Sequence, residues 1–344
     1  MSPQSHDEPS APHPRATNVL FGHSAAETTL LNAYRSGRIP HAFLIVGPKG
    51  IGKATLAYRL ARFAMAHPDP AVPDVQMATS LAIGENDPVA RRIAAQGQPD
   101  LLVIERVVND KGVLHKLIRV EDVRETVPFF GSTAREGGWR VAIVDAVDEL
   151  NASGANALLK VLEEPPERAL LLLVSHSASR VLPTIRSRCR ILTLRPLEPA
   201  DLGAAIAATT GRNPNDPEVV QAAAAADGSV ARALAMLDGD ALELRQRAMA
   251  MLDRLPVTDT KALHALGEAI AGTDAAPLAA FLDTVNDWLS AQLDQEQGGI
   301  ARLNRLAEAS ERINEAVRDA ETYNLERKPL VFSVFGLLAE ATRG

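Results

Sequence analysis

The first half of the chain alternates short apolar runs with a segment of helical periodicity. Strand-like runs rich in Val, Ile and Leu occur at residues 41–47, 100–107, 139–147 and 169–177. Residues 53–66 place apolar side chains at helical spacing directly after the first run. Near-continuous apolar runs are typical of strands covered on both faces, and strands that alternate with helices favour a parallel sheet. The pattern predicts an α/β domain.

The second half is patterned for helices alone. Ala-rich helical segments follow the α/β region, and polar breaks interrupt a further helical stretch that continues to the last residues. We therefore divide the chain into a disordered tail (1–16), an α/β nucleotide-binding-like domain (17–197) and two helical domains (198–240 and 241–344). The Pro-rich stretch 66–88 is weakly patterned and is predicted to be an insertion or an irregular loop.

Composition narrows the class of protein. The 344 residues are 46% hydrophobic but only 4% aromatic, which favours helices over sandwiches or barrels. The net charge of −7 argues against a chain that binds a polyanion over its whole surface. The single cysteine, Cys189, excludes a disulfide framework and a multi-cysteine zinc site. No run has the length of a membrane span or a signal peptide core, so we expect a cytoplasmic protein without zinc or membrane contact.

Residues 47–55 read GPKGIGKAT and match most of the phosphate-binding pattern G-x-x-x-x-G-K-[ST]. In such a loop, backbone N–H groups and the start of a helix surround phosphate oxygens, and the lysine reaches the outer phosphates. The hydroxyl that would bind Mg²⁺ is replaced by Ala54, and Thr55 lies about 100° further round the helix. The predicted contacts to ATP or ADP, with Mg²⁺ bound weakly or not at all, are Gly47, Gly50, Gly52, Lys53, Ala54 and Thr55.

A second strand of such a site ends in an Asp that holds Mg²⁺ and a Glu that orients the attacking water. Asp145 closes the third apolar run and is the predicted acidic residue of the nucleotide site, but Ala146 follows it in place of Glu. The pair Asp148–Glu149 comes later and is predicted to face away from the phosphate loop. Two independent losses, at positions 54 and 146, predict a degenerate ATPase site with little or no activity of its own.

Two later runs carry a specific resemblance. Residues 156–166 read NALLKVLEEPP, and residues 182–189 read LPTIRSRC. Together with the phosphate loop and the acidic strand, in this order, they resemble the clamp-loader branch of the AAA+ ATPases. The resemblance implies an α/β AAA+ domain with a RecA-like parallel sheet, followed by a small helical lid and an all-α collar domain. It also implies a component of a DNA-directed DNA polymerase holoenzyme.

In that family, ATP lies between neighbouring subunits of a ring that loads a sliding clamp on primed DNA. The resemblance implies that the partners are clamp-loader ATPase subunits, the clamp-opening subunit and, through the assembled complex, the sliding clamp and primed DNA. It identifies Arg188 as an arginine finger that acts in trans on the ATP of the next subunit. A guanidinium beside a γ-phosphate neutralises charge that develops in the transition state. The alternative to a catalytic role is that Arg186, Arg188 and Arg190 line a solvated edge of a strand.

Other positions depart from an active member of that family. Ala231 stands where an arginine that senses nucleotide is frequent. Ser175 or Ser177 is the candidate hydroxyl sensor at the end of the fourth apolar run. The family keeps the segment around His41 near the nucleotide base, and a core or turn histidine is an equal alternative.

Two further functions stay open. One is an active ATPase subunit of the same loader or another AAA+ motor, which Ala54 and Ala146 disfavour. The other is a phosphate-loop kinase, in which the runs at 156–166 and 182–189 would have no role. ATP turnover by the isolated chain would favour the first of these.

Overall fold

The computed structural model describes residues 12–108, 115, 117–131, 138–237, 240–272, 275–294, 299–323 and 325–343. Contacts divide the chain into two compact units, Met1–Leu234 and Ala235–Gly344. The first unit takes in the α/β region together with most of the segment predicted as a lid. None of the helices in the described ranges combines the length and the apolar character that a bilayer crossing requires.

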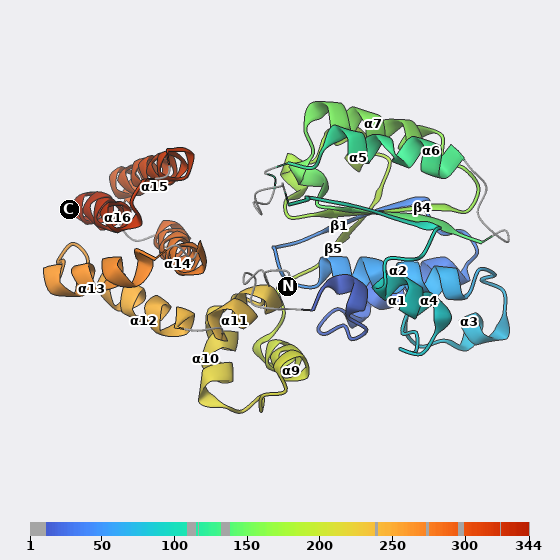
Figure 1. Ribbon diagram of the computed structural model, residues 1–344, viewed down its shortest axis with the longest axis horizontal. Helices are drawn as coiled ribbons and strands as arrows, with labels where there is room; N and C mark the ends of the chain where they lie inside the picture. Colours follow the sequence, from blue (N-terminus) through green and yellow to red (C-terminus); the bar gives the residue numbers. More distant parts are fainter. Residues whose placement is uncertain are drawn as a thin grey trace, which may run out of the picture. The chain divides into compact units, whose positions relative to one another are not determined.

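A five-stranded parallel sheet forms the centre of the first unit, in the order β2-β3-β4-β1-β5 (Figure 1). The strands are β1 (Ala42–Val46), β2 (Leu101–Glu105), β3 (Arg140–Asp145), β4 (Ala169–Ser175) and β5 (Arg190–Thr193). Every residue of β1 and β4 is buried, which explains their unbroken apolar sequence. The four predicted strands are present, and the parallel sheet between helices confirms the predicted α/β architecture. β5 lacks an apolar run because most of its residues are exposed.

Helices cover both faces of the sheet (Figure 1). One face carries α1 (Ser24–Arg35), α2 (Lys53–Ala66), α3 (Pro73–Met77) and α4 (Pro88–Ala94). The other carries α5 (Val120–Arg124), α6 (Thr126–Gly131) and α7 (Ala152–Glu163). Leu158 and Leu162 of α7 share a hydrophobic core with Leu171 and Leu173 of β4. The stretch 66–88, predicted as an irregular loop, is helical in part because it contains α3.

A buried arginine fixes the segment that precedes α1. The sequence predicts a tail up to residue 16, but the short 3-10 helix η1 (Pro14–Ala16) is present; residues 1–11 lie outside the described ranges. Arg62 of α2 is 2% exposed and donates to the carbonyls of Pro14, Arg15 and Thr17 at 2.6 to 2.9 Å. Burial lowers the pKa of Arg62 to about 10, so the guanidinium stays charged at neutral pH. Its desolvation is offset by these hydrogen bonds.

The sheet leads into the segment predicted as the lid. α8 (Pro183–Arg186) precedes β5, and α9 (Pro199–Thr210), α10 (Pro217–Ala225) and α11 (Val230–Leu237) follow it. Just before α11, Gly228 has a φ of +72°, and a Cβ there would lie 2.4 Å from the backbone nitrogen of Leu197. The Leu197 N–H donates to the Gly228 carbonyl at 3.1 Å. This close turn ties the start of α11 to the end of the sheet region.

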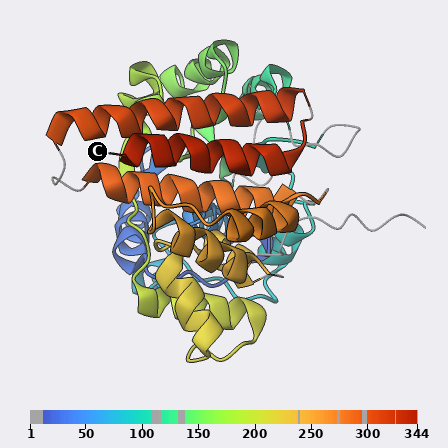
Figure 2. The ribbon, with the colours of Figure 1, turned by 90° about the vertical axis from the view of Figure 1, so that its left-hand side faces the viewer.

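The second unit is all-α. It consists of α12 (Ala241–Leu252), α13 (Thr260–Ile270), α14 (Ala275–Asp294), α15 (Gly299–Thr322) and α16 (Arg327–Thr342). α14, α15 and α16 run side by side (Figure 2). Phe281 of α14 and Phe335 of α16 stack with ring centroids 6.1 Å apart. The buried apolar residues of α16 in the core of this unit are Leu330, Val331, Val334, Phe335, Leu338 and Ala341.

Removal of the Arg62 side chain should release η1. Arg62→Ala leaves the carbonyls of Pro14, Arg15 and Thr17 without their donors, at a cost of about 3 kcal/mol. We expect a lower thermal unfolding midpoint and faster tryptic cleavage after Arg15, measured by circular dichroism and mass spectrometry. The matched control is Arg91→Ala, which removes an exposed arginine from α4. Equal cleavage rates in Arg62→Ala and wild type would contradict the anchoring role.

Candidate functional site

The phosphate loop joins the carboxyl end of β1 to the start of α2, as the sequence predicts. Gly50 has a φ of +79°, and a Cβ there would lie 2.3 Å from Ser229 Oγ and 2.8 Å from Ala231 Cβ. A Cβ on Gly47 would lie 2.6 Å from the carbonyl oxygen of Leu194. Both positions therefore require glycine. The space beside Gly50 is filled by the residues that begin α11.

Backbone groups of the loop are also bonded to distant parts of the chain. The Ala231 N–H donates to the Gly50 carbonyl at 3.3 Å. His23 Nε2 lies 2.6 Å from the carbonyl oxygen of Ile51, so the proton of this ring is on Nε2. Burial lowers the pKa of His23, which favours the neutral ring. No motif in the sequence marks His23, and its contact with the loop was not predicted.

Lys53 is the first residue of α2 and is only 3% exposed. Its Nζ donates to the carbonyl of Pro48 within the same loop. Burial lowers the pKa of Lys53 to about 8, and the carboxylates of Asp145 and Asp148 oppose this shift. Lys53, which the loop pattern predicts to contact the outer phosphates, therefore has a hydrogen-bond acceptor and two carboxylates within its own chain.

Asp145 ends β3 and lies beside Glu105, its register partner at the end of β2. Burial raises the pKa of Asp145 to about 6; Lys53 opposes the rise, and Glu105 adds to it. The predicted pair Lys53 and Asp145 therefore comes together at the carboxyl end of the sheet. Ala146, which stands in place of a water-orienting Glu, is 1% exposed and presents only a buried methyl group.

The side chains of this site offer fewer ligands to Mg²⁺ than the full phosphate-loop pattern does. Mg²⁺ demands a near-octahedral set of oxygen ligands. Ala54 offers no oxygen in the first turn of α2, and Thr55 beside it is half-buried. Within the described ranges, no group of three or more His, Cys, Asp or Glu side chains is arranged to hold a metal ion. The loop retains the form of a phosphate site and the nearby carboxylate of Asp145, but it lacks the hydroxyl ligand at position 54.

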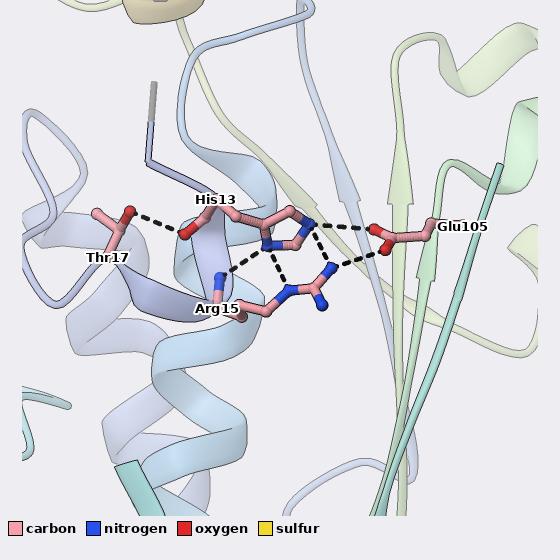
Figure 3. A network of polar contacts seen from close by, with 4 residues as sticks. All are labelled: His13, Arg15, Thr17 and Glu105. Carbon is pink, nitrogen blue, oxygen red and sulfur yellow. Dashed lines mark hydrogen bonds and ion pairs between the residues drawn. The ribbon is translucent and has the colours of Figure 1, made fainter. Parts of the chain in front are cut away.

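The N-terminal segment supplies partners to the carboxylate beside Asp145 (Figure 3). Arg15 Nη2 donates to Glu105 Oε1 at 2.9 Å, and His13 Nε2 lies 3.3 Å from Glu105 Oε2. The hydrogen bond from His13 is the main reason that the pKa of Glu105 is lowered. Thr17 Oγ1 donates to the His13 carbonyl at 3.2 Å. The contacts of His13 and Arg15 were not predicted, because residues 1–16 have the composition of a disordered tail.

The prediction that Asp148 faces away from the loop is wrong. Its carboxylate is among the charges that oppose the lowered pKa of Lys53, and its Oδ1 accepts the His176 N–H at 2.9 Å. The 3-10 turn η3 (Val147–Glu149) directly after β3 accounts for this position. Glu149 Oε2 instead pairs with Arg106 Nε at 2.7 Å.

The hydroxyls proposed as sensors are bonded within one turn. Ser175 Oγ donates to the Ser177 carbonyl at 3.0 Å and accepts the Ser177 N–H at 3.1 Å. His176 lies between these two serines. Burial lowers the pKa of His176 to about 4, and the positive charge of Lys53 lowers it further. His176, to which the sequence assigned no role, is thus the residue after β4 that interacts with Lys53. His41 lies at the opposite, amino end of β1, which favours a core or turn histidine.

Arg188 lies in the turn between α8 and β5, and its side chain is 37% exposed. Nη2 pairs with Glu163 Oε1 at 2.9 Å, and Nη1 donates to the Thr184 carbonyl at 3.0 Å. Arg186 ends α8 and Arg190 begins β5, so the three arginines do not alternate along one strand. The alternative of a solvated strand edge therefore applies to Arg190 alone.

Comparisons with known proteins relate this chain to subunits of DNA polymerase III. A family model described as DNA polymerase III, delta subunit, matches residues 22–198. The DNA polymerase III subunit delta' of Pseudomonas aeruginosa is 40% identical over 149 residues, which are 43% of this chain and 41% of that protein. The subunit tau/gamma of Haemophilus influenzae is 30% identical over 258 residues, 74% of this chain and 34% of that protein. These matches span less than half the length of either relative.

Among solved structures, a DNA polymerase III gamma subunit-related protein from Thermotoga maritima is similar to 91% of this chain. The match covers 99% of that protein, with 16% sequence identity and a TM-score of 0.46.

The Asp145 carboxyl should titrate near pH 6 rather than near 3.8. Its pKa is higher in the folded than in the unfolded chain, so it stabilises the fold as the pH falls from about 6 to 4. That contribution is lost as the pH rises through 6. Carbon-13 NMR of the carboxyl, assigned with Asp145→Asn, measures the midpoint. Lys53→Met removes the opposing cation and should move the midpoint higher, whereas a wild-type midpoint near 3.8 would contradict the buried site.

Proposed function

The chain belongs to the DNA polymerase III delta-subunit family, and from that premise we propose that it is a delta-prime-type subunit of a replicative clamp loader. In this role it is a stator, a fixed subunit that does not hydrolyse ATP itself. It donates an arginine finger in trans to a neighbouring ATPase subunit while the sliding clamp is loaded on primed DNA.

The contrast between two places in the first unit carries this proposal. At the phosphate loop, Ala54 and Ala146 replace the residues for Mg²⁺ binding and water activation, and the start of α11 packs against Gly50. Arg188, by contrast, is accessible on a turn outside that loop. A chain with a disabled site and an exposed, hydrogen-bonded arginine is suited to act on a phosphate that its neighbour holds.

An arginine finger stabilises negative charge electrostatically and forms no covalent bond in the reaction. In the transition state of phosphoryl transfer, negative charge spreads over the oxygens of the moving phosphoryl group and the leaving oxygen. An arginine guanidinium is positively charged and has a planar array of N–H donors that matches phosphate oxygens. Such a finger accelerates hydrolysis by about 10³- to 10⁵-fold.

The partners follow from this role. We propose the loader's ATPase subunits and its clamp-opening subunit as direct neighbours, with the clamp and primed DNA contacted through the assembled complex. A net charge of −7 favours DNA contact through such a complex over binding by the whole surface of this chain. The work takes place in the cytoplasm with the bacterial replicase. Backbone N–H groups of the loop and Lys53 can hold ATP or ADP, with Mg²⁺ weak or absent.

An active ATPase subunit of the same loader is the second candidate. It is favoured by Lys53 and Asp145, which interact electrostatically at the carboxyl end of the sheet. It is disfavoured by Ala54 and Ala146. Dependence of the loader on Arg188, without turnover by the isolated chain, separates the stator from this candidate.

Arg188→Ala should sharply reduce ATP hydrolysis by a loader reconstituted with clamp and primed DNA. We expect a loss of at least about 10-fold in steady-state rate, and little recovery in Arg188→Lys, because an ammonium cannot reproduce the planar donors. Gel filtration checks that the complex still assembles. Arg190→Ala is the matched control, an exposed arginine two residues away at the start of β5. A fully active loader that contains Arg188→Ala would contradict the proposed function.

A further inference from the structure

We propose that Glu163 is a positioning residue for Arg188, an inference that rests on the proposed function of Arg188 as the arginine finger. The two side chains come from different elements, the last residue of α7 and the turn after α8. Glu163 Oε1 and Arg188 Nη2 are 2.9 Å apart. The side chains are 50% and 37% exposed, so the pair is accessible to a phosphate on another subunit.

The elements that carry this pair share one hydrophobic core. Leu158 and Leu162 of α7 belong to the same buried cluster as Ile185 of α8. Residues on packed elements keep their geometry better than residues on unsupported loops. The distance between the backbones of Glu163 and Arg188 is therefore set by core packing, and the salt bridge only has to orient the side chains.

Hydrogen bonds also restrain the turn that holds Arg188. The Ser187 N–H donates to the Pro183 carbonyl at 3.0 Å, and the Arg188 N–H donates to the Ile185 carbonyl at 3.1 Å. The Thr184 carbonyl accepts from both Ser187 Oγ at 3.1 Å and Arg188 Nη1 at 3.0 Å. The backbone and one end of the guanidinium are thus fixed within the turn itself.

Glu163 fixes the other end of the guanidinium. A guanidinium is planar and has five N–H donors. Thr184 and Glu163 bind different terminal nitrogens of Arg188, and two anchors on separate nitrogens define the orientation of the plane. Donors that these two contacts do not use can face an incoming anion. Without Glu163, the side chain retains only the Thr184 anchor among the contacts of the described residues.

The sign of the mutational effect separates positioning from competition. If Glu163 merely occupied the place of the incoming phosphate, its removal would free Arg188 and increase loader activity. If it orients Arg188, its removal lets the guanidinium sample unproductive directions and lowers activity. Exposed ion pairs contribute little to folding stability, so variants of Glu163 should fold normally.

Glu163→Ala in the reconstituted loader should lower kcat for ATP hydrolysis by about 5- to 10-fold. The KM for ATP and the assembly of the complex should not change, because Arg188 acts in the transition state. Glu163→Gln keeps an acceptor oxygen and should recover most of the loss. The matched control is Glu164→Ala, which removes the next carboxylate, exposed and outside the contacts of Arg188 in the described part of the chain.

A double substitution tests whether Glu163 acts through Arg188. In a loader that already carries Arg188→Ala, Glu163→Ala should cause no additional loss. An additional loss of about 5- to 10-fold would show that Glu163 acts independently of Arg188. That result would overturn the inference. Higher activity in the single variant Glu163→Ala would overturn it as well.

Nitrogen-15 NMR of the Arg188 guanidinium in the isolated chain reports the pair without any loader. Restricted rotation of the guanidinium is expected in wild type, and faster rotation in Glu163→Ala. If Arg188→Ala disables the loader but Glu163→Ala does not, the inference fails and the proposed function stands. If Arg188→Ala leaves the loader active, both fail.

Discussion

The contact between the lid segment and the phosphate loop is the constraint on which the candidate site depends. A Cβ on Gly50 would lie 2.3 Å from Ser229 Oγ, and the Ala231 N–H donates to the carbonyl of the same glycine. A long side chain at position 231 would have to leave this close contact. The alanine that resembles a lost nucleotide sensor is therefore also the residue that lets the lid segment lie against the loop.

Charged side chains are also buried at this end of the sheet. Lys53, Asp145 and Glu105 lie at the carboxyl end of the sheet, where a working ATPase would face its nucleotide. Here Lys53 bonds to Pro48, and Glu105 is bound by residues of the N-terminal segment. Unpaired buried charges are costly, so these contacts have a structural reason. The catalytic role that we propose for this chain belongs to Arg188, which lies on a different turn and is exposed.

Features encoded in short runs could be predicted from the sequence. The strands β1 and β4 follow from unbroken apolar runs, and the loop follows from its glycines. Contacts between distant residues could not be predicted. Arg62 binds carbonyls 45 to 48 residues earlier in the chain, in a segment whose composition is that of a tail. His23 reaches Ile51 across 28 residues, and Asp148 is redirected by a single 3-10 turn.

The claim that this phosphate loop no longer serves as an ATPase site is tested most directly by steady-state ATP hydrolysis of the isolated chain. Wild type should be compared with Lys53→Ala, which removes the lysine that any activity of this loop would need. We predict that wild type shows no turnover above that of the variant. Saturable turnover that Lys53→Ala abolishes would contradict the claim, because the site would then work despite Ala54 and Ala146.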